Sequence, residues 1–300
     1  MKGIEAKRCL DDPDLHAEVI RFNLSRFKPD VALPLLDLTV EAQAFGVQPL
    51  YREFDAPSLR SRIPLGDPRL EEDHAHRAPE RAQSMAKAAK RIAEQTKDVP
   101  CGFYITGPFT VAGQVIGVEE LLKGTAKGLP ALSSLLAECT EVVMDYARRL
   151  EESGVDFLVM ADPTSSLISG KHFLTHSKEH IKAVRRSVSI DIVLHMCGKS
   201  GHLIKDMVET GVAGISLDQN VNLSDAVKAV PRSVMVFGNY PPTNLTFEKP
   251  EQIRRNVEAM LAPVEGAGNV VASTGCDLPP FTPAENIDAF IQAAKSRRTT

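Results

Sequence analysis

The sequence contains no tryptophan, and aromatic residues make up only 5% of its 300 positions. Proteins that bind single-stranded nucleic acids stack the bases on aromatic side chains, so this composition disfavours such a platform. The formal net charge is −4, and the 35 Lys and Arg residues are mixed along the chain with 39 Asp and Glu residues. The chain therefore lacks a basic stripe for phosphate backbones or anionic lipids, and we expect neither a nucleic-acid nor a membrane partner.

An export signal and a membrane span are also missing from the sequence. The first fourteen residues, MKGIEAKRCLDDPD, are charged and contain no apolar core of the kind a signal peptide needs, and no apolar run approaches the length of a bilayer span. The five cysteines are odd in number and widely scattered, unlike a disulfide framework. They are Cys9, Cys101, Cys139, Cys197 and Cys276. We therefore expect a cytoplasmic protein with reduced thiols, in which a special cysteine would act as a ligand or nucleophile.

Helices that lead directly into buried strands are the main pattern along the chain. Apolar residues recur at helical spacing from Leu132 to Leu150, and the helix stops at Gly154. The next segment, VDFLVMAD (155–162), is an apolar run of the kind expected for a strand buried on both faces. The same order recurs four more times. Helices 171–187, 200–209, 223–229 and 249–262 precede strands 191–195, 213–218, 233–239 and 269–274.

Two further strands are expected upstream, at 31–38 and 101–106, separated by a charged helical stretch at 69–97 that Pro79 interrupts. We predict an α/β fold of the (βα)₈ TIM-barrel type, regular or irregular, as a single catalytic domain over 31–300 after a helical segment at 1–30. Seven strands are clear, and the eighth could lie near 49–54. The alternative is a doubly wound open sheet. It loses support because no G-x-G-x-x-G follows the first strand and no G-x-x-x-x-G-K-[ST] occurs.

Polar side chains that could bind a metal or take part in catalysis occur where the predicted strands end. In parallel βα folds these carboxyl ends meet at one mouth. The candidates are Asp37, Thr106 with Gly107, Asp162, His195 with Cys197, Asp218, Asn239 with Tyr240, and Thr274 with Cys276. So many His, Cys and Asp residues at such positions are hard to explain by packing alone.

The sequence H-M-C at 195–197 gives the sharpest prediction. Residues i and i+2 of an extended segment point to the same side, so His195 and Cys197 can both face the mouth, where Cys276 would complete a metal triangle. Three protein ligands leave a tetrahedral zinc one open position, as in catalytic sites, and thiolates favour zinc over magnesium or calcium. A 197–276 disulfide is a weaker alternative because the cytosol keeps thiols reduced. A structural zinc site is weaker too, because short C-x₂-C ligand pairs are absent.

A thiol bound at the open position of such a zinc would lose its proton and become a strong nucleophile for a methyl group. Asp218 could be a fourth ligand, a partner that fixes the His195 tautomer, or a surface carboxylate. Asp162 could accept a hydrogen bond from the substrate or cap the following helix. We interpret the remaining histidine stripe as a solvated or rim face. It consists of His172, His176 and His180.

Three longer segments carry a family resemblance. They are H-M-C-G (195–198), G-N-Y-P-P (238–242) and S-T-G-C-D-L-P-P-F-T-P-A-E-N-I (273–287), supported by L-T-V-E-A-Q-A-F-G (38–46) and G-P-F-T-V-A-G (107–113). The chain resembles the uroporphyrinogen decarboxylase superfamily, and within it the methylcobalamin:coenzyme M methyltransferase branch. More distantly, it resembles cobalamin-independent methionine synthase.

The resemblance implies a barrel, a zinc ion held by His195, Cys197 and Cys276, and methyl transfer involving a corrinoid carried on a partner protein. Its substrates would be a small thiol or a methylated compound, in either direction of transfer. A pocket would be shaped by Thr106, Gly107, Pro108, Asn239 and Tyr240. The R-Q-A-G-R-Y motif with which decarboxylases bind porphyrin carboxylates is absent, which argues against decarboxylation. A porphyrin decarboxylase and a non-catalytic docking subunit for a corrinoid protein are the alternatives.

Overall fold

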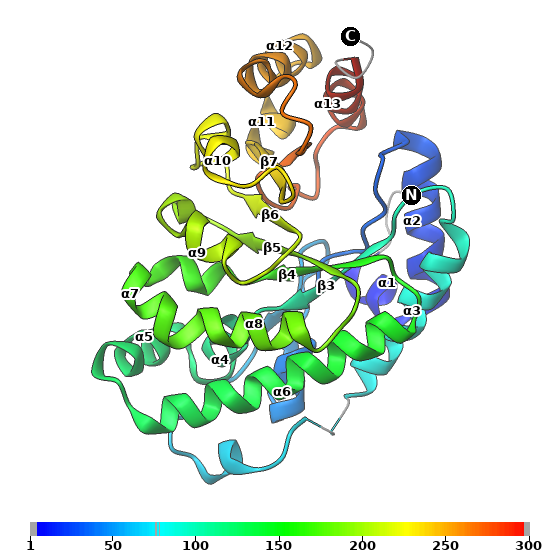
Figure 1. The fold of residues 1–300 in the computed structure, drawn as a ribbon. Coiled ribbons are helices and arrows are strands. Elements are labelled where there is room, and N and C mark those ends of the chain that lie inside the picture. Colours follow the sequence, from blue (N-terminus) through cyan, green and yellow to red (C-terminus); the bar gives the residue numbers. More distant parts are fainter. Residues whose placement is uncertain (1–4, 76, 78, 297–300) are drawn as a thin grey trace.

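A parallel sheet of six strands forms the centre of the molecule (Figure 1). The computed structural model describes residues 5–75, 77 and 79–296. Each strand pairs with the next one along the chain. The strands are β3 (Gly102–Thr106), β4 (Phe157–Ala161), β5 (Asp191–Met196), β6 (Gly214–Leu217), β7 (Met235–Tyr240) and β8 (Val270–Thr274). All six agree with the predicted strands to within two residues at either end.

Helices follow the strands and cover the outside of the sheet. The first five are α1 (Ala6–Asp11), α2 (Pro13–Phe27), α3 (Glu80–Gln95), α4 (Pro108–Ile116) and α5 (Val118–Lys127). The next five are α6 (Pro130–Glu152), α7 (Gly170–Phe173), α8 (Glu179–Arg186), α9 (Ile204–Val208) and α10 (Leu223–Ala229). The last three are α11 (Pro242–Phe247), α12 (Pro250–Leu261) and α13 (Ala284–Ser296). Gly154 and Gly211 both have φ of +83°, a left-handed conformation that glycine adopts without a Cβ clash, which confirms the predicted joints.

The register of the sheet separates an outer from an inner face. One row of paired residues is at most 1% exposed and lies under the helices. It consists of Ile105, Met160, Leu194, Ile215 and Val236. Side chains alternate along a strand, so the next row faces the interior. That row is Thr106, Ala161, His195, Ser216 and Phe237.

Three predictions upstream of β3 need correction. The segment 31–38 is not a strand, because it contributes only an isolated parallel bridge between Ala32 and Cys101. Residues 49–54 do not supply the eighth barrel strand either. Instead β1 (Pro49–Leu50) pairs antiparallel with β2 (Ser58–Leu59) in a separate hairpin. The helical stretch predicted at 69–97 is shorter than expected, because its described residues before Pro79 contain only a 3₁₀ turn at Pro68–Glu71. The predicted break at Pro79 is confirmed, since α3 begins directly after it.

The two ends of the described chain meet beside the sheet. Arg26 on α2 and Asp288 on α13 form a two-pronged ion pair with N···O distances of 2.8 and 2.6 Å. This contact lies on the side of the sheet where the edge strands β8 and β3 face each other. Within the described residues, no backbone hydrogen bonds pair these two strands. In the part of the chain that the structure describes, a contact between two helices and not a strand ladder therefore links these two sides of the sheet. Among the described residues, no helix combines the length and apolar composition that crossing a membrane requires.

Candidate metal centre

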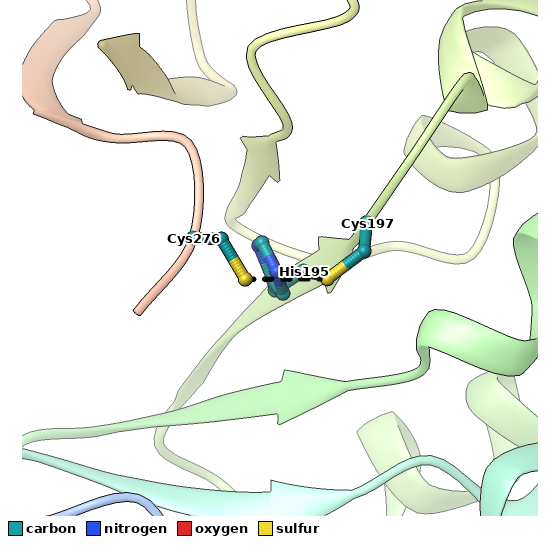
Figure 2. Close-up of side chains that lie close together, drawn as sticks. All are labelled: His195, Cys197 and Cys276. Atoms are coloured by element: carbon teal, nitrogen blue, oxygen red, sulfur yellow. Dashed lines mark hydrogen bonds between the residues drawn. The ribbon is translucent and has the colours of Figure 1, made fainter. Parts of the chain in front are cut away.

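His195, Cys197 and Cys276 converge at the carboxyl ends of the strands (Figure 2). His195 lies near the end of β5, Cys197 directly follows that strand, and Cys276 lies two residues after β8. His195 Nε2 is 3.1 Å from Cys197 Sγ, which is 3.6 Å from Cys276 Sγ. One ligand atom from each residue lies within 4.8 Å of the other two. The imidazole thus faces both sulfurs, as the H-M-C spacing predicts.

A serine on the neighbouring strand holds the imidazole in this orientation. Ser216 Oγ lies 3.0 Å from His195 Nδ1, and the two residues are direct register partners on β5 and β6. When Nε2 is used as a ligand, Nδ1 carries the proton and donates to the serine hydroxyl. Sequence reasoning missed Ser216. The only available signal was its position on the inner face, two residues before Asp218.

The two thiols have unequal proton affinities. The hydrogen bond between the sulfurs, together with burial, raises the pKa of Cys197, and the nearby charge of Asp218 adds to this. The same hydrogen bond, with a second one from His195, lowers the pKa of Cys276. Cys276 is therefore the thiol that first gives up its proton, and Cys197 needs a cation to do so.

Asp218 lies outside the three-residue group. Its Oδ1 accepts hydrogen bonds from the backbone and side-chain amides of Asn220, at 2.8 and 2.5 Å. The His195 Nδ1 contact, one of the roles open to Asp218 from the sequence, is made by Ser216. What Asp218 does supply is a negative charge close enough to act on Cys197.

Asp162 is fully buried and saturated with hydrogen bonds. Its Oδ1 accepts from the backbone amide and the hydroxyl of Thr110, and its Oδ2 accepts from Ser165 and Ser177. Thr110 N belongs to the first turn of α4, so Asp162 caps that helix and not the 3₁₀ helix that follows it in sequence. A Cβ on Gly107 would lie 2.4 Å from the Asp162 Cβ, which explains a glycine at that position.

The residues expected to shape the pocket are all buried, and none of them is a lining residue of the cavity described below. Pro108 opens α4 directly after Gly107. The amide of Asn239 donates to the backbone oxygens of Asp218 and Val221, at 2.9 and 2.6 Å. Tyr240 is 2% exposed, and its hydroxyl donates to Glu248 at 2.7 Å, beyond the outer side of the sheet. These contacts tie the loops after β6 and β7 together around the mouth.

Thr106 is bound to a carboxyl group that sequence reasoning did not single out. Glu41 Oε1 accepts from the Thr106 amide at 2.6 Å, and Oε2 lies 2.8 Å from the Thr106 hydroxyl, which is also 3.0 Å from the Leu38 carbonyl oxygen. The Thr106 hydroxyl has one proton and two acceptors within reach. A protonated Glu41 that donates to this hydroxyl, while the hydroxyl donates to Leu38, satisfies all three groups. Burial raises the pKa of Glu41 to about 8, in agreement with this assignment.

The predicted histidine stripe does not join the metal centre. The rings of His172 and His176 stack with centroids 5.9 Å apart, and His180 Nδ1 lies 2.8 Å from the Thr140 hydroxyl. All three are half-buried: His172 lies on α7, His176 on the π-helical turn Leu174–Lys178, and His180 in the first turn of α8.

A cavity of about 980 Å³ is lined in part by the segment that follows Cys276. Its walls come mainly from α1, α2 and residues 277–285. That last segment follows Cys276 directly, so the cavity lining is continuous in sequence with one of the three ligands. This space was not foreseen from the sequence, because it forms between the two ends of the chain.

A family model described as uroporphyrinogen decarboxylase (URO-D) matches residues 1–297. The chain belongs to this family. Similar curated proteins include the methylcobamide:CoM methyltransferase MtaA of Methanosarcina barkeri, 29% identical over 71% of this chain. The match covers 63% of that protein's length. The methylcobamide:CoM methyltransferase MtbA of Methanosarcina acetivorans is 27% identical over 87% of this chain and 78% of its own length. A uroporphyrinogen decarboxylase of a Synechococcus species is 27% identical over 95% of this chain and 84% of its own length.

Solved structures confirm the predicted fold class. A methyltransferase from Methanosarcina mazei superposes with a TM-score of 0.87 at 25% identity, over 98% of this chain and 88% of that one. A B12-independent methionine synthase from a Shewanella species gives a TM-score of 0.65 at 13% identity, over 95% and 89% of the two chains, which shows a shared fold alone. The six described strands therefore belong to the barrel-type fold of the URO-D family.

Proposed function

We propose that this protein is a zinc-dependent methyltransferase that moves a methyl group between a corrinoid and a small thiol or a methylated substrate. The observation that carries the proposal is the convergence of one imidazole and two thiols at the mouth of the barrel. Two of the relatives named above are methylcobamide:CoM methyltransferases, which supports the corrinoid as the other reactant.

The donor set fits zinc in number and in kind. His195 Nε2 and the sulfurs of Cys197 and Cys276 are soft or borderline ligands, and three of them leave one position of a tetrahedron for a substrate. A zinc ion bound there would supply a Lewis acid that lowers the pKa of a substrate thiol.

The surrounding residues of the chain keep this geometry fixed. Ser216 sets the direction of the His195 ring, and Asp162 joins the carboxyl end of β4 to the start of α4 through its bonds to Thr110. We assign Asp162 a positioning role, because both of its oxygens are engaged and it is fully buried. Asp218 acts through its negative charge near Cys197. The cavity lined by the segment after Cys276 provides space for the substrate.

The proposal implies a corrinoid-binding protein as partner, docked over the mouth. The thiol would release its proton to solvent, a sulfur–carbon bond would form, and the cobalt–carbon bond would break with its electron pair left on cobalt. The reverse direction would start from a methylated substrate and cob(I)alamin.

The direct test is to mix the zinc-loaded protein with methylcobalamin and a panel of thiols and to follow cob(I)alamin by its absorbance. We expect thiol-dependent demethylation, and its loss together with zinc in Cys197→Ser. Uroporphyrinogen turnover that needs no metal would support the decarboxylase alternative. If Cys197→Ser lost zinc but left function unchanged, a docking subunit would be the better explanation.

A further inference from the structure

The cavity that Asp277 and the residues after it help to line has exposed aromatic rings in its lining. Phe22 on α2 is 43% exposed, Phe54 in the hairpin loop is 39% exposed, and Phe281 after β8 is 75% exposed. The rings of Phe54 and Phe281 meet edge to face with centroids 5.6 Å apart. Exposed apolar side chains gathered around a concavity mark a place where a ligand or partner is bound.

The charged side chains in the same lining are all negative. They are Asp55, Asp277 and Glu285, and no Lys or Arg is among the lining residues. None of the three carboxylates forms an ion pair with another described residue. Arg52 lines a separate groove that adjoins the cavity and shares Asp55 and Asp277 with it.

Aromatic faces combined with unpaired carboxylates are the chemistry that selects a cation. A ring attracts a positive charge placed over its face, and it does so best for alkylated ammonium groups that are weakly hydrated. The carboxylates repel anions and so favour cations over thiols that carry a sulfonate or a carboxylate.

We propose that the cavity is the subsite for the non-reacting part of the substrate, and that this substrate is a thiol bearing a positively charged, ammonium-type group. The inference rests on the proposed function, since it places the sulfur at the three ligands and the ammonium group between the aromatic rings and the carboxylates. Asp277 follows Cys276 directly, so one backbone segment connects the two parts of the site.

The test uses three thiols of similar size in the methylcobalamin assay: 2-aminoethanethiol, 2-mercaptoethanol and 2-mercaptoethanesulfonate. We expect kcat/KM to fall in that order, with at least a tenfold difference between the first and the last. The double variant Asp55→Asn, Glu285→Gln should reduce this difference at least threefold, mainly through KM. Glu258→Gln, an exposed carboxylate on α12 outside the cavity lining, is the matched control and should change nothing.

A second measurement separates this inference from the proposed function. Tetramethylammonium has no N–H group to donate and no lone pair with which to coordinate a metal, so it probes the cavity alone. Its binding to the metal-depleted protein is measured by calorimetry, with sodium chloride of equal ionic strength as the control. Binding that is weakened by Phe54→Leu and by the double variant would support the cavity assignment even if no thiol were methylated. Equal or better turnover of the sulfonate thiol, with loss on Arg52→Gln, would overturn the cationic substrate and leave methyl transfer standing.

Discussion

Replacing Ser216 with alanine measures how much its hydrogen bond to His195 contributes to metal affinity. The substitution removes one hydroxyl, 3.0 Å from His195 Nδ1, and leaves all three ligand atoms in place. Partners of metal-bound imidazoles typically contribute about 10- to 100-fold in affinity. Ser216 is half-buried and makes a single neutral hydrogen bond to the ring, worth about 1 kcal/mol. We therefore expect the low end, roughly a tenfold loss of zinc affinity, or about 1.4 kcal/mol.

The assay is competition for zinc between the protein and a chromophoric chelator at constant pH. Ser273→Ala is the matched control, because Ser273 is also a half-buried strand serine, and its hydroxyl bonds a backbone oxygen of Thr274 at 3.2 Å. The control should keep the affinity of the parent protein. An affinity in Ser216→Ala within twofold of the parent, with the fold intact, would refute the claim that Ser216 orients the ligand.

Three other outcomes follow from the site. Zinc affinity should fall as pH is lowered, because Cys197 and Cys276 must lose their protons on binding, and calorimetry in buffers of different ionisation enthalpy should detect that proton release. A raised pKa means that Glu41 stabilises the fold fully below the ordinary carboxyl pKa, and that this contribution is lost as pH rises through about 8. Glu41→Gln keeps the contacts to Thr106 and should flatten the dependence of unfolding free energy on pH between those limits. If urea titrations at several pH values gave the same pH dependence for the variant and the parent, the protonated form of Glu41 would be contradicted. Asp162→Ala should cost about 3 kcal/mol or more, because it leaves several buried donors without an acceptor, and an unfolding midpoint equal to the parent would refute that role.

The sequence alone determined the six strands of the sheet and the order in which they pair. Each strand is a short apolar run preceded by a helix, and two of the joints contain a glycine, Gly154 or Gly211, with positive φ. These signals are local, so they survive without knowledge of the neighbours. The same regularity predicted that His195, Cys197 and Cys276 lie close together, because the carboxyl ends of all parallel strands meet at one mouth.

Only the tertiary structure decided which partners these side chains use. Residues 31–38 have the composition of a strand but reach the sheet through a single bridge at Ala32, since pairing depends on a neighbour and not on propensity alone. Register placed Ser216, and not Asp218, against the His195 ring. Asp162 caps a helix earlier in the chain, since its bonding partner Thr110 lies 52 residues before it. Such contacts, like the cavity between the two ends of the chain, join segments far apart in sequence, and no local pattern encodes them.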